Sequence, residues 1–165
     1  TRIAVFDNDG EFLRQWSLQR LAGEDVFAGP HCIHLANDGL VYVCDRFANR
    51  IQVFDHNGQI QQIIDVGFEP VTAPEGRQSG ERGTVVVLAF SSDAEQRYMY
   101  VLNQNTVRVE VLDRLSGELL TSFGKGPGRY RGQFELPHGI GVDSEGNVII
   151  AEQEGRRVQK FNLIN

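Results

Sequence analysis

The segment RIQVFDHNG, residues 50–58, carries the pattern from which the fold of this chain is inferred. An arginine is followed by alternating apolar and polar residues and then by a turn. The same pattern recurs as RIAVFDNDG at residues 2–10, RVEVLD at 108–113 and RVQKFN at 157–162. Because side chains alternate between the two faces of a strand, a period of two indicates β-strands rather than helices.

Turn residues divide these strands into hairpins. Asn-Asp-Gly at 37–39, Asn-Gly at 57–58 and Ser-Glu-Gly at 144–146 are typical of tight turns between antiparallel strands. One complete unit then contains four short strands, expected at 32–36, 40–44, 51–55 and 59–65. Four short strands that recur about every 40–50 residues are typical of a β-propeller blade.

The number of repeats predicts an all-β fold that is an incomplete propeller. Residues 1–18 supply two strands of a part blade, 29–66 and 83–123 supply full blades, and 137–163 supply three strands of another part blade. A closed ring commonly needs four to eight blades of four strands. The whole chain, 1–165, is therefore expected to form about three blades.

Composition excludes some partners. The net charge is −6, which disfavours unspecific binding to nucleic acid, so a nucleic-acid partner is not expected. No apolar run reaches the roughly 18–20 residues that a membrane span needs, and no membrane partner is expected. Because the sequence starts at Thr1 without a methionine, we expect residues to precede it, and we assign no cellular compartment.

Two segments resemble the NHL repeat closely. Residues 126–151 contain GQFELPHGIGVD followed by GNVIIA, and residues 29–55 run from Gly29-Pro30-His31 through VCDR to NRIQVFD. The resemblance implies an NHL-type β-propeller, of which this chain is about half, because such propellers typically have six blades. The blade between these segments looks more like that of bacterial NHL proteins. The resemblance favours a module that binds a protein, a peptide or a small-molecule ligand at the channel or the loop face.

A narrower resemblance concerns the peptidyl-α-hydroxyglycine α-amidating lyases, in which histidines of Pro-His pairs on alternating blades bind zinc. Pro30-His31 and Pro137-His138 occupy matching positions here, with one blade between them. The resemblance implies His31 and His138 as metal ligands, zinc as the cofactor and Arg46 as a catalytic residue of a C–N lyase. The alternative is that both histidines belong to the repeat consensus and satisfy backbone groups or line the channel.

The repeat itself separates structural from functional candidates. Arg50 recurs in every copy, so we expect its stem to pack on the blade and its charged head to stay in water. Arg46 does not recur, since Gln104 and Gln153 replace it, which makes it the better ligand-contacting candidate. The acidic or amide residue before it, Asp45, is expected to be structural and to accept backbone N–H groups.

The turn at 37–39 also sets a strand register. It places His34 opposite Tyr42, on the other side of the strand from His31, and Cys32 opposite Cys44. Opposite Cβ atoms lie about 4.5–5.5 Å apart, so a bridge forms only at a close pair, and we expect two small buried thiols instead.

Two loops and the open ends of the propeller are further candidates for contact. Residues 68–83 form a polar inter-blade insertion, and the loop 124–133 carries Lys125, Arg129, Tyr130 and Arg131. An unclosed propeller leaves two blade edges open, and a homodimer that completes the ring would cover them.

Overall fold

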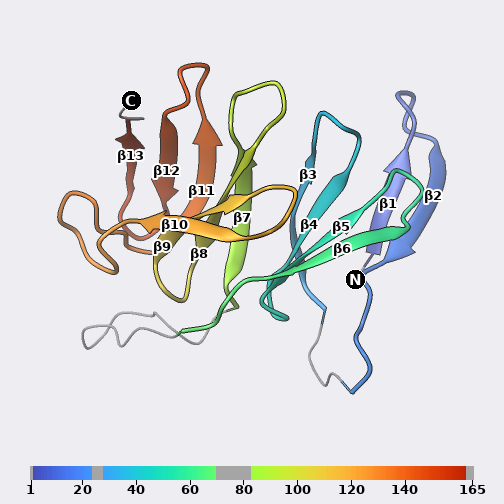
Figure 1. Ribbon diagram of the computed structural model, residues 1–165, viewed down its shortest axis with the longest axis horizontal. Helices are drawn as coiled ribbons and strands as arrows, with labels where there is room; N and C mark the ends of the chain where they lie inside the picture. The colour runs from blue at the N-terminus through green and yellow to red at the C-terminus, as the bar shows by residue number, and fades with distance from the viewer. Residues whose placement is uncertain (1, 24–27, 70–82, 163–165) are drawn as a thin grey trace.

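The computed structural model describes residues 2–23, 28–69 and 83–162. Within these ranges the chain forms thirteen β-strands in four antiparallel sheets (Figure 1). The described residues form no helix, and so none that is long and apolar enough to cross a membrane. The predicted all-β fold is confirmed.

Each sheet is a meander in which consecutive strands pair. The first sheet has two strands, the second and third have four each, and the last has three. They comprise β1 (Arg2–Phe6) and β2 (Phe12–Ser17); β3 (Pro30–Leu35), β4 (Val41–Asp45), β5 (Arg50–Phe54) and β6 (Ile60–Asp65); β7 (Val85–Phe90), β8 (Tyr98–Asn103), β9 (Arg108–Asp113) and β10 (Leu119–Phe123); and β11 (Pro137–Val142), β12 (Val148–Glu152) and β13 (Arg157–Phe161).

Aspartates at the strand ends close the hairpins. The Asp55 carboxylate accepts hydrogen bonds from the backbone N–H groups of Asn57 and Gln59, at 2.8 and 2.9 Å. Asp143 accepts in the same way from Glu145 and Asn147, at 3.0 and 2.9 Å. Such side-chain bonds to the next residues of the chain stabilise a turn against continued strand, so the strand breaks follow from the local sequence.

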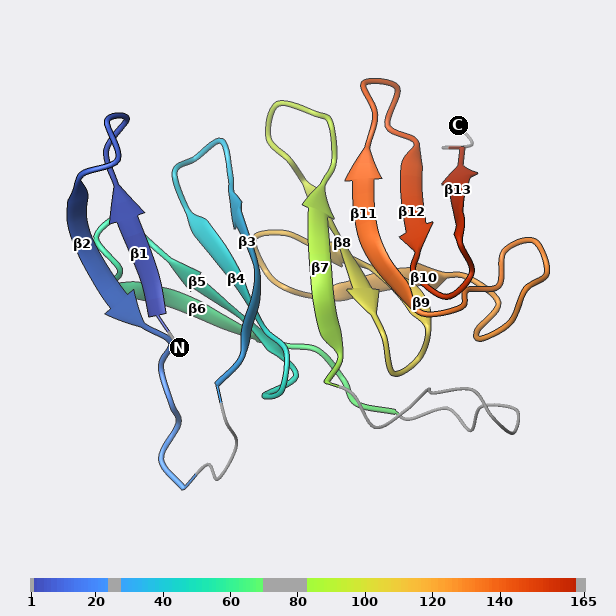
Figure 2. The same ribbon diagram turned by 180° about the vertical axis from the view of Figure 1, so that it is seen from behind.

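The sheets stand side by side in an arc, with the two-stranded sheet at one end and the three-stranded sheet at the other (Figures 1 and 2). The first strands of three blades are neighbours, because β7 contacts both β3 and β11. The later strands lie farther from this row (Figure 2). This radial arrangement is that of a partial β-propeller, with β3, β7 and β11 on its inner side.

Three apolar cores lie between successive sheets and hold the arc together. The first joins the β1–β2 sheet to the second sheet and contains Ile3, Val43 and Phe54. The next joins the two complete blades, and the last packs Phe134 between the third and fourth sheets. Since each sheet buries its faces against its neighbours, no blade has a core of its own.

The register between β3 and β4 agrees with the prediction, but the state of the cysteines does not. His34 lies opposite Tyr42, and Cys32 lies opposite Cys44. The prediction of two thiols is wrong, because Cys32 and Cys44 form a disulfide with a Cα–Cα distance of 4.9 Å. That distance lies within the range that a disulfide spans, so this opposite pair is close enough to bridge.

Candidate functional site

The same irregularity occurs at the start of each inner strand. The pairing register shifts between Pro30 and Cys32 in β3, between Val85 and Val87 in β7, and between Pro137 and Gly139 in β11. His31, Val86 and His138 are the residues skipped by these shifts. A β-bulge leaves one residue unpaired and bends the strand locally, so these are equivalent positions at one end of the inner strands; Val86 is buried, and the two histidines are exposed.

The two predicted metal-ligand histidines lie together in the structure. His31 and His138 come from the strands on either side of β7, and their ring centroids are 5.3 Å apart at an interplanar angle of 63°. Both side chains are exposed in the described part of the chain. Residues from two blades that are separated by a whole third blade in sequence therefore form one imidazole pair.

Arg46, the predicted catalytic residue, joins this pair. It is the first residue after β4, where its backbone N–H donates to Gly29 O at 3.0 Å, and its side chain is buried. Its Nη1 lies 3.0 Å from His31 Nε2, and its Nη2 donates to Gln104 Oε1. Gln104 Nε2 in turn donates to Pro137 O at 3.3 Å. Side chains of three blades are thus linked, and we call His31, Arg46, Gln104 and His138 the axial cluster.

Gln104 was not singled out from the sequence as a member of the site. The signal that could have found it is the repeat, because Gln104 occupies in its blade the position that Arg46 occupies in the preceding one. Its backbone N–H donates to Thr84 O, as that of Arg46 does to Gly29 O. Equivalent positions of adjacent blades lie close together around the axis. The residue at the position equivalent to a candidate, in the adjacent blade, is therefore itself a candidate.

The hydrogen bonds determine the tautomer of His31. Its Nδ1 lies 2.7 Å from Val86 O, which only accepts, so Nδ1 carries the proton. A guanidinium only donates, so Nε2 accepts from Arg46. Partial desolvation of the largely exposed ring lowers the pKa of the His31 imidazole, against the effect of the Val86 carbonyl, and the charge of Arg46 lowers it further. Because Nδ1 donates and Nε2 accepts, the ring in this arrangement is a neutral imidazole with both nitrogens engaged.

A zinc ion does not fit this donor set as it stands. Zinc binds the lone pair of a neutral imidazole nitrogen, and the lone pair of His31 already accepts from Arg46. Among the described residues, no group of three or more His, Cys, Asp or Glu side chains is placed to hold a metal. Zinc at His31 and His138 stays a prediction, which the titration described below tests.

Arg50, the arginine that recurs in every repeat, lies in a different environment from the one that the sequence predicts. Arg50 is buried, so the prediction that its head stays in water is wrong. Its Nε pairs with Asp45 Oδ2 at 2.9 Å, and its Nη2 donates to Gln19 O at 2.8 Å. Asp45 also accepts from the Gly29 N–H and from Gln52 Nε2, both at 2.9 Å. Because Asp45 compensates the charge, the guanidinium is accommodated inside, and the structural role expected for Asp45 agrees with these contacts.

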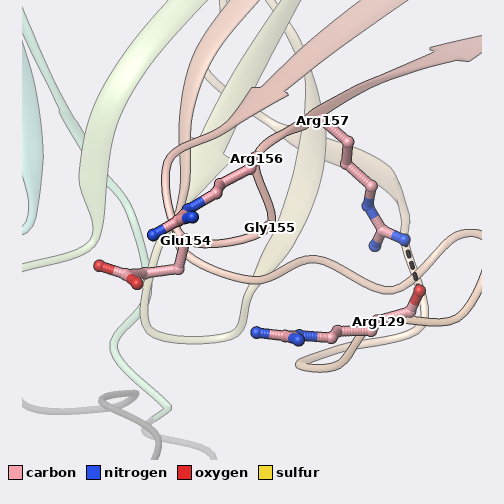
Figure 3. A pocket seen from close by; sticks show the side chains of 5 residues that line it. All are labelled: Arg129, Glu154, Gly155, Arg156 and Arg157. Carbon is pink, nitrogen blue, oxygen red and sulfur yellow. Dashed lines mark hydrogen bonds between the residues drawn. The ribbon is translucent and has the colours of Figure 1, made fainter.

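A second, peripheral site lies beside the β12–β13 turn. A pocket of about 540 Å³ is lined there by Arg129, Glu154, Gly155, Arg156 and Arg157 (Figure 3). Figure 3 shows the side chains of Arg129, Arg156 and Glu154 extending to the same side. Glu154 places a carboxylate among the guanidinium groups, so the pocket does not present one sign of charge.

Arg157 gives the loop 124–133 its place against this turn. It pairs with Glu152 Oε1 at 2.7 Å and donates to Gln133 O at 2.7 Å. Arg129, one of the predicted patch residues, pairs with Glu135 at 2.5 Å. Both arginines therefore have structural partners: Arg157 holds the loop against the last blade, and Arg129 pairs with a residue that follows the loop. The other predicted contact loop, 68–83, lies mostly outside the described residues.

Comparisons with known proteins agree with the propeller architecture. The NHL repeat model matches residues 27–54. The chain is 28% identical to peptidyl-alpha-hydroxyglycine alpha-amidating lyase 1 of Drosophila melanogaster over 97% of its length, which is 30% of the relative. It is 26% identical to peptidyl-glycine alpha-amidating monooxygenase of Mus musculus over 99% of its length and 16% of the relative. NHL repeat-containing protein 3 of Homo sapiens is 24% identical over 98% of the chain and 45% of the relative.

Solved structures show the same fold at low sequence identity. The WD40 beta propeller domain of Doa1 matches with a TM-score of 0.64 at 14% identity, over 98% of this chain and 43% of that one. Streptogramin B lyase matches with a TM-score of 0.54 at 20% identity, over 84% of this chain and 42% of that one. The chain spans less than half the length of these relatives and structures. It is a partial β-propeller that carries an NHL repeat.

Proposed function

We propose that the chain belongs to a propeller module that binds a protein, peptide or small-molecule ligand at the end of the inner strands, through the axial cluster. The observation that carries this proposal is the convergence of His31, Arg46, Gln104 and His138 from three blades. Two of these side chains are exposed, and bulges in the inner strands direct both. Exposed polar groups that a rigid scaffold brings together are typical of binding sites.

Selection from a phage-displayed peptide library tests this function. The intact protein serves as bait, and a His31→Ala/His138→Ala variant serves for counter-selection. We expect peptides that bind the wild type and lose at least about tenfold in affinity for the variant, which corresponds to about 1.4 kcal/mol. Tyr130→Ala, in the exposed loop 124–133, is the matched control and should leave binding unchanged. Selected peptides that bind both histidine forms equally would refute an axial site.

A second candidate function is a zinc-dependent lyase that cleaves a peptide ending in α-hydroxyglycine. The proximity of His31 and His138 and the similarity to a protein named for that activity support it, but it requires that Arg46 release the lone pair of His31 so that zinc can bind. In such a reaction the C–N bond breaks, the hydroxyl oxygen gives up its proton as the C=O bond of glyoxylate forms, and the leaving nitrogen gains a proton to give the peptide amide. Arg46 would be the residue that contacts the substrate.

One assay separates the two functions. The intact protein is incubated with an N-acyl peptide that ends in α-hydroxyglycine, with and without added zinc, and glyoxylate is measured. Release that needs zinc and is lost in the Arg46→Ala and His138→Ala variants supports the lyase. Binding of the peptide without release of glyoxylate supports the binding module.

We further propose that a second copy covers the two-stranded sheet and completes the ring. The two-stranded sheet exposes Phe6, Phe12 and Leu13 by more than half. Mass measurement in solution tests this: a dimer that dissociates in a Leu13→Glu variant supports completion by a second copy, and a monomer at all concentrations contradicts it.

A further inference from the structure

We propose that Arg46 holds the place of a metal ion at His31 and thereby keeps the axial histidine pair from binding divalent metals. Arg46 is then the residue that determines which ligands the axial cluster accepts. With Arg46 in place, a ligand is held by hydrogen bonds rather than by coordination to a metal. The inference does not depend on which ligand binds.

His31 is arranged as a metal-binding histidine usually is. Such a residue donates one ring N–H to a backbone carbonyl or carboxylate, which fixes the tautomer and directs the other nitrogen to the metal. Here the Nδ1–H donates to Val86 O at 2.7 Å, and the Nε2 lone pair points to Arg46 Nη1, the other neighbour of the ring within the axial cluster. The His138 ring lies beside it, with its centroid 5.3 Å away.

The guanidinium of Arg46 occupies the direction in which a metal would lie. Its Nη1 is 3.0 Å from His31 Nε2, whereas zinc would sit about 2.0–2.1 Å from the same nitrogen. One lone pair does not serve a hydrogen-bond donor and a metal together. Arginine also keeps its charge at any ordinary pH, so a divalent cation beside it would meet a fixed positive charge.

Arg46 is held in this place from more than one side. Its Nη2 donates to Gln104 Oε1, and Gln104 is itself tied to Pro137 O in the next blade. Only 8% of Arg46 is exposed, and its backbone N–H is bonded to Gly29 O. A metal that entered the cluster would have to displace a charge-assisted hydrogen bond and separate a contact between two blades.

Zinc titration of the intact protein tests the proposal. Arg46→Met removes the donor and the charge while retaining a similar length, and Arg46→Lys retains the charge. We expect the zinc dissociation constant of Arg46→Met to fall by about ten- to a hundredfold relative to wild type, as expected from losing one charge-assisted bond. The gain should vanish in Arg46→Met/His31→Ala and in Arg46→Met/His138→Ala. Arg46→Lys and Arg114→Met, a buried arginine in another hairpin, should bind zinc no better than wild type.

Two results would overturn the proposal. The first is stoichiometric zinc in the wild-type protein that is lost in His31→Ala. The second is equal zinc affinity of wild type and a folded Arg46→Met variant. Nitrogen-15 NMR of the imidazoles in the wild type supplies a measurement that needs no variant. It should show the Nδ1–H tautomer at His31 and unchanged His31 signals at one equivalent of zinc, and the opposite tautomer would contradict the arrangement.

Discussion

Replacing Asp45 by Asn removes the carboxylate that compensates a buried arginine while leaving the size of the side chain unchanged. Asp45 is fully buried and accepts hydrogen bonds from Gly29 N, Arg50 Nε and Gln52 Nε2, each at 2.9 Å. Asparagine offers one acceptor oxygen in place of two. Whichever way its amide is turned, its NH₂ group faces donors.

The expected cost follows from the burial of Arg50, which is 2% exposed. Removing one partner of a buried ion pair costs about 3–5 kcal/mol, because it weakens the attraction that offsets the desolvation of the other charge. We expect Asp45→Asn to reduce the free energy of unfolding by an amount in this range.

The neighbouring blade shows another arrangement of the equivalent positions, which suggests a double variant. There the equivalent positions hold Asn103 and Glu110, and Asn103 Nδ2 donates to Glu110 Oε1 at 2.7 Å. The carboxyl group of that blade stands at the position of Gln52, while the equivalent arginine, Arg108, is exposed and its Nε donates to Gly124 O at 3.2 Å. Gln52→Glu alone should destabilise, since it places a second carboxylate beside Asp45. In the Asp45→Asn/Gln52→Glu double variant, we expect a favourable coupling of about 1–3 kcal/mol between the two changes.

Urea unfolding of the wild type, both single variants and the double variant completes this cycle. The free energies of unfolding are compared at neutral pH, with unchanged m values as the criterion that the unfolded states are alike. A loss below about 1 kcal/mol for Asp45→Asn would refute the role given to the ion pair. Effects that add within about 0.5 kcal/mol would refute the coupling between Asp45 and Gln52.

Three further changes test other contacts. Burial raises the pKa of the Glu110 carboxyl above 4.5, so the folded state holds this proton more tightly than the unfolded chain. The free energy of unfolding of the wild type should therefore fall as the pH rises through the raised pKa. The urea midpoint of Glu110→Gln, measured between about pH 4 and 8, should not show this fall. Arg156 has a φ of 49°, a left-handed conformation that glycine adopts without strain. Arg156→Gly should therefore raise the free energy of unfolding by about 0.5–1 kcal/mol, whereas Arg156→Ala should give no gain. Equal effects of the two variants in thermal unfolding would contradict backbone strain. The Cys32→Ala/Cys44→Ala variant lacks the disulfide, whose cysteines are twelve residues apart, and its free energy of unfolding should be lower by about 3 kcal/mol. A reducing dithiol should lower the urea midpoint of the wild type but not that of the variant.

Period-two alternation and turn residues were sufficient to predict the strands of this chain. Both depend on neighbours in sequence: alternation places one face of a strand inside, and an aspartate or glycine closes the next hairpin. The turn at 37–39 even determined which residues lie opposite in the first hairpin, so the pairs His34–Tyr42 and Cys32–Cys44 were predicted correctly. The same local logic identified Arg46 as a departure from its own repeat.

Contacts between blades required the tertiary structure. The sequence placed Arg50 in water, but Asp45 and the backbone of Gln19 enclose its guanidinium. It suggested His31 and His138 as partners only through a resemblance, and nothing local indicated that Arg46 would donate to His31. These contacts depend on how bulged strands from separate blades are turned toward a common axis. That orientation is set by the packing of whole sheets against each other, which no short-range pattern contains.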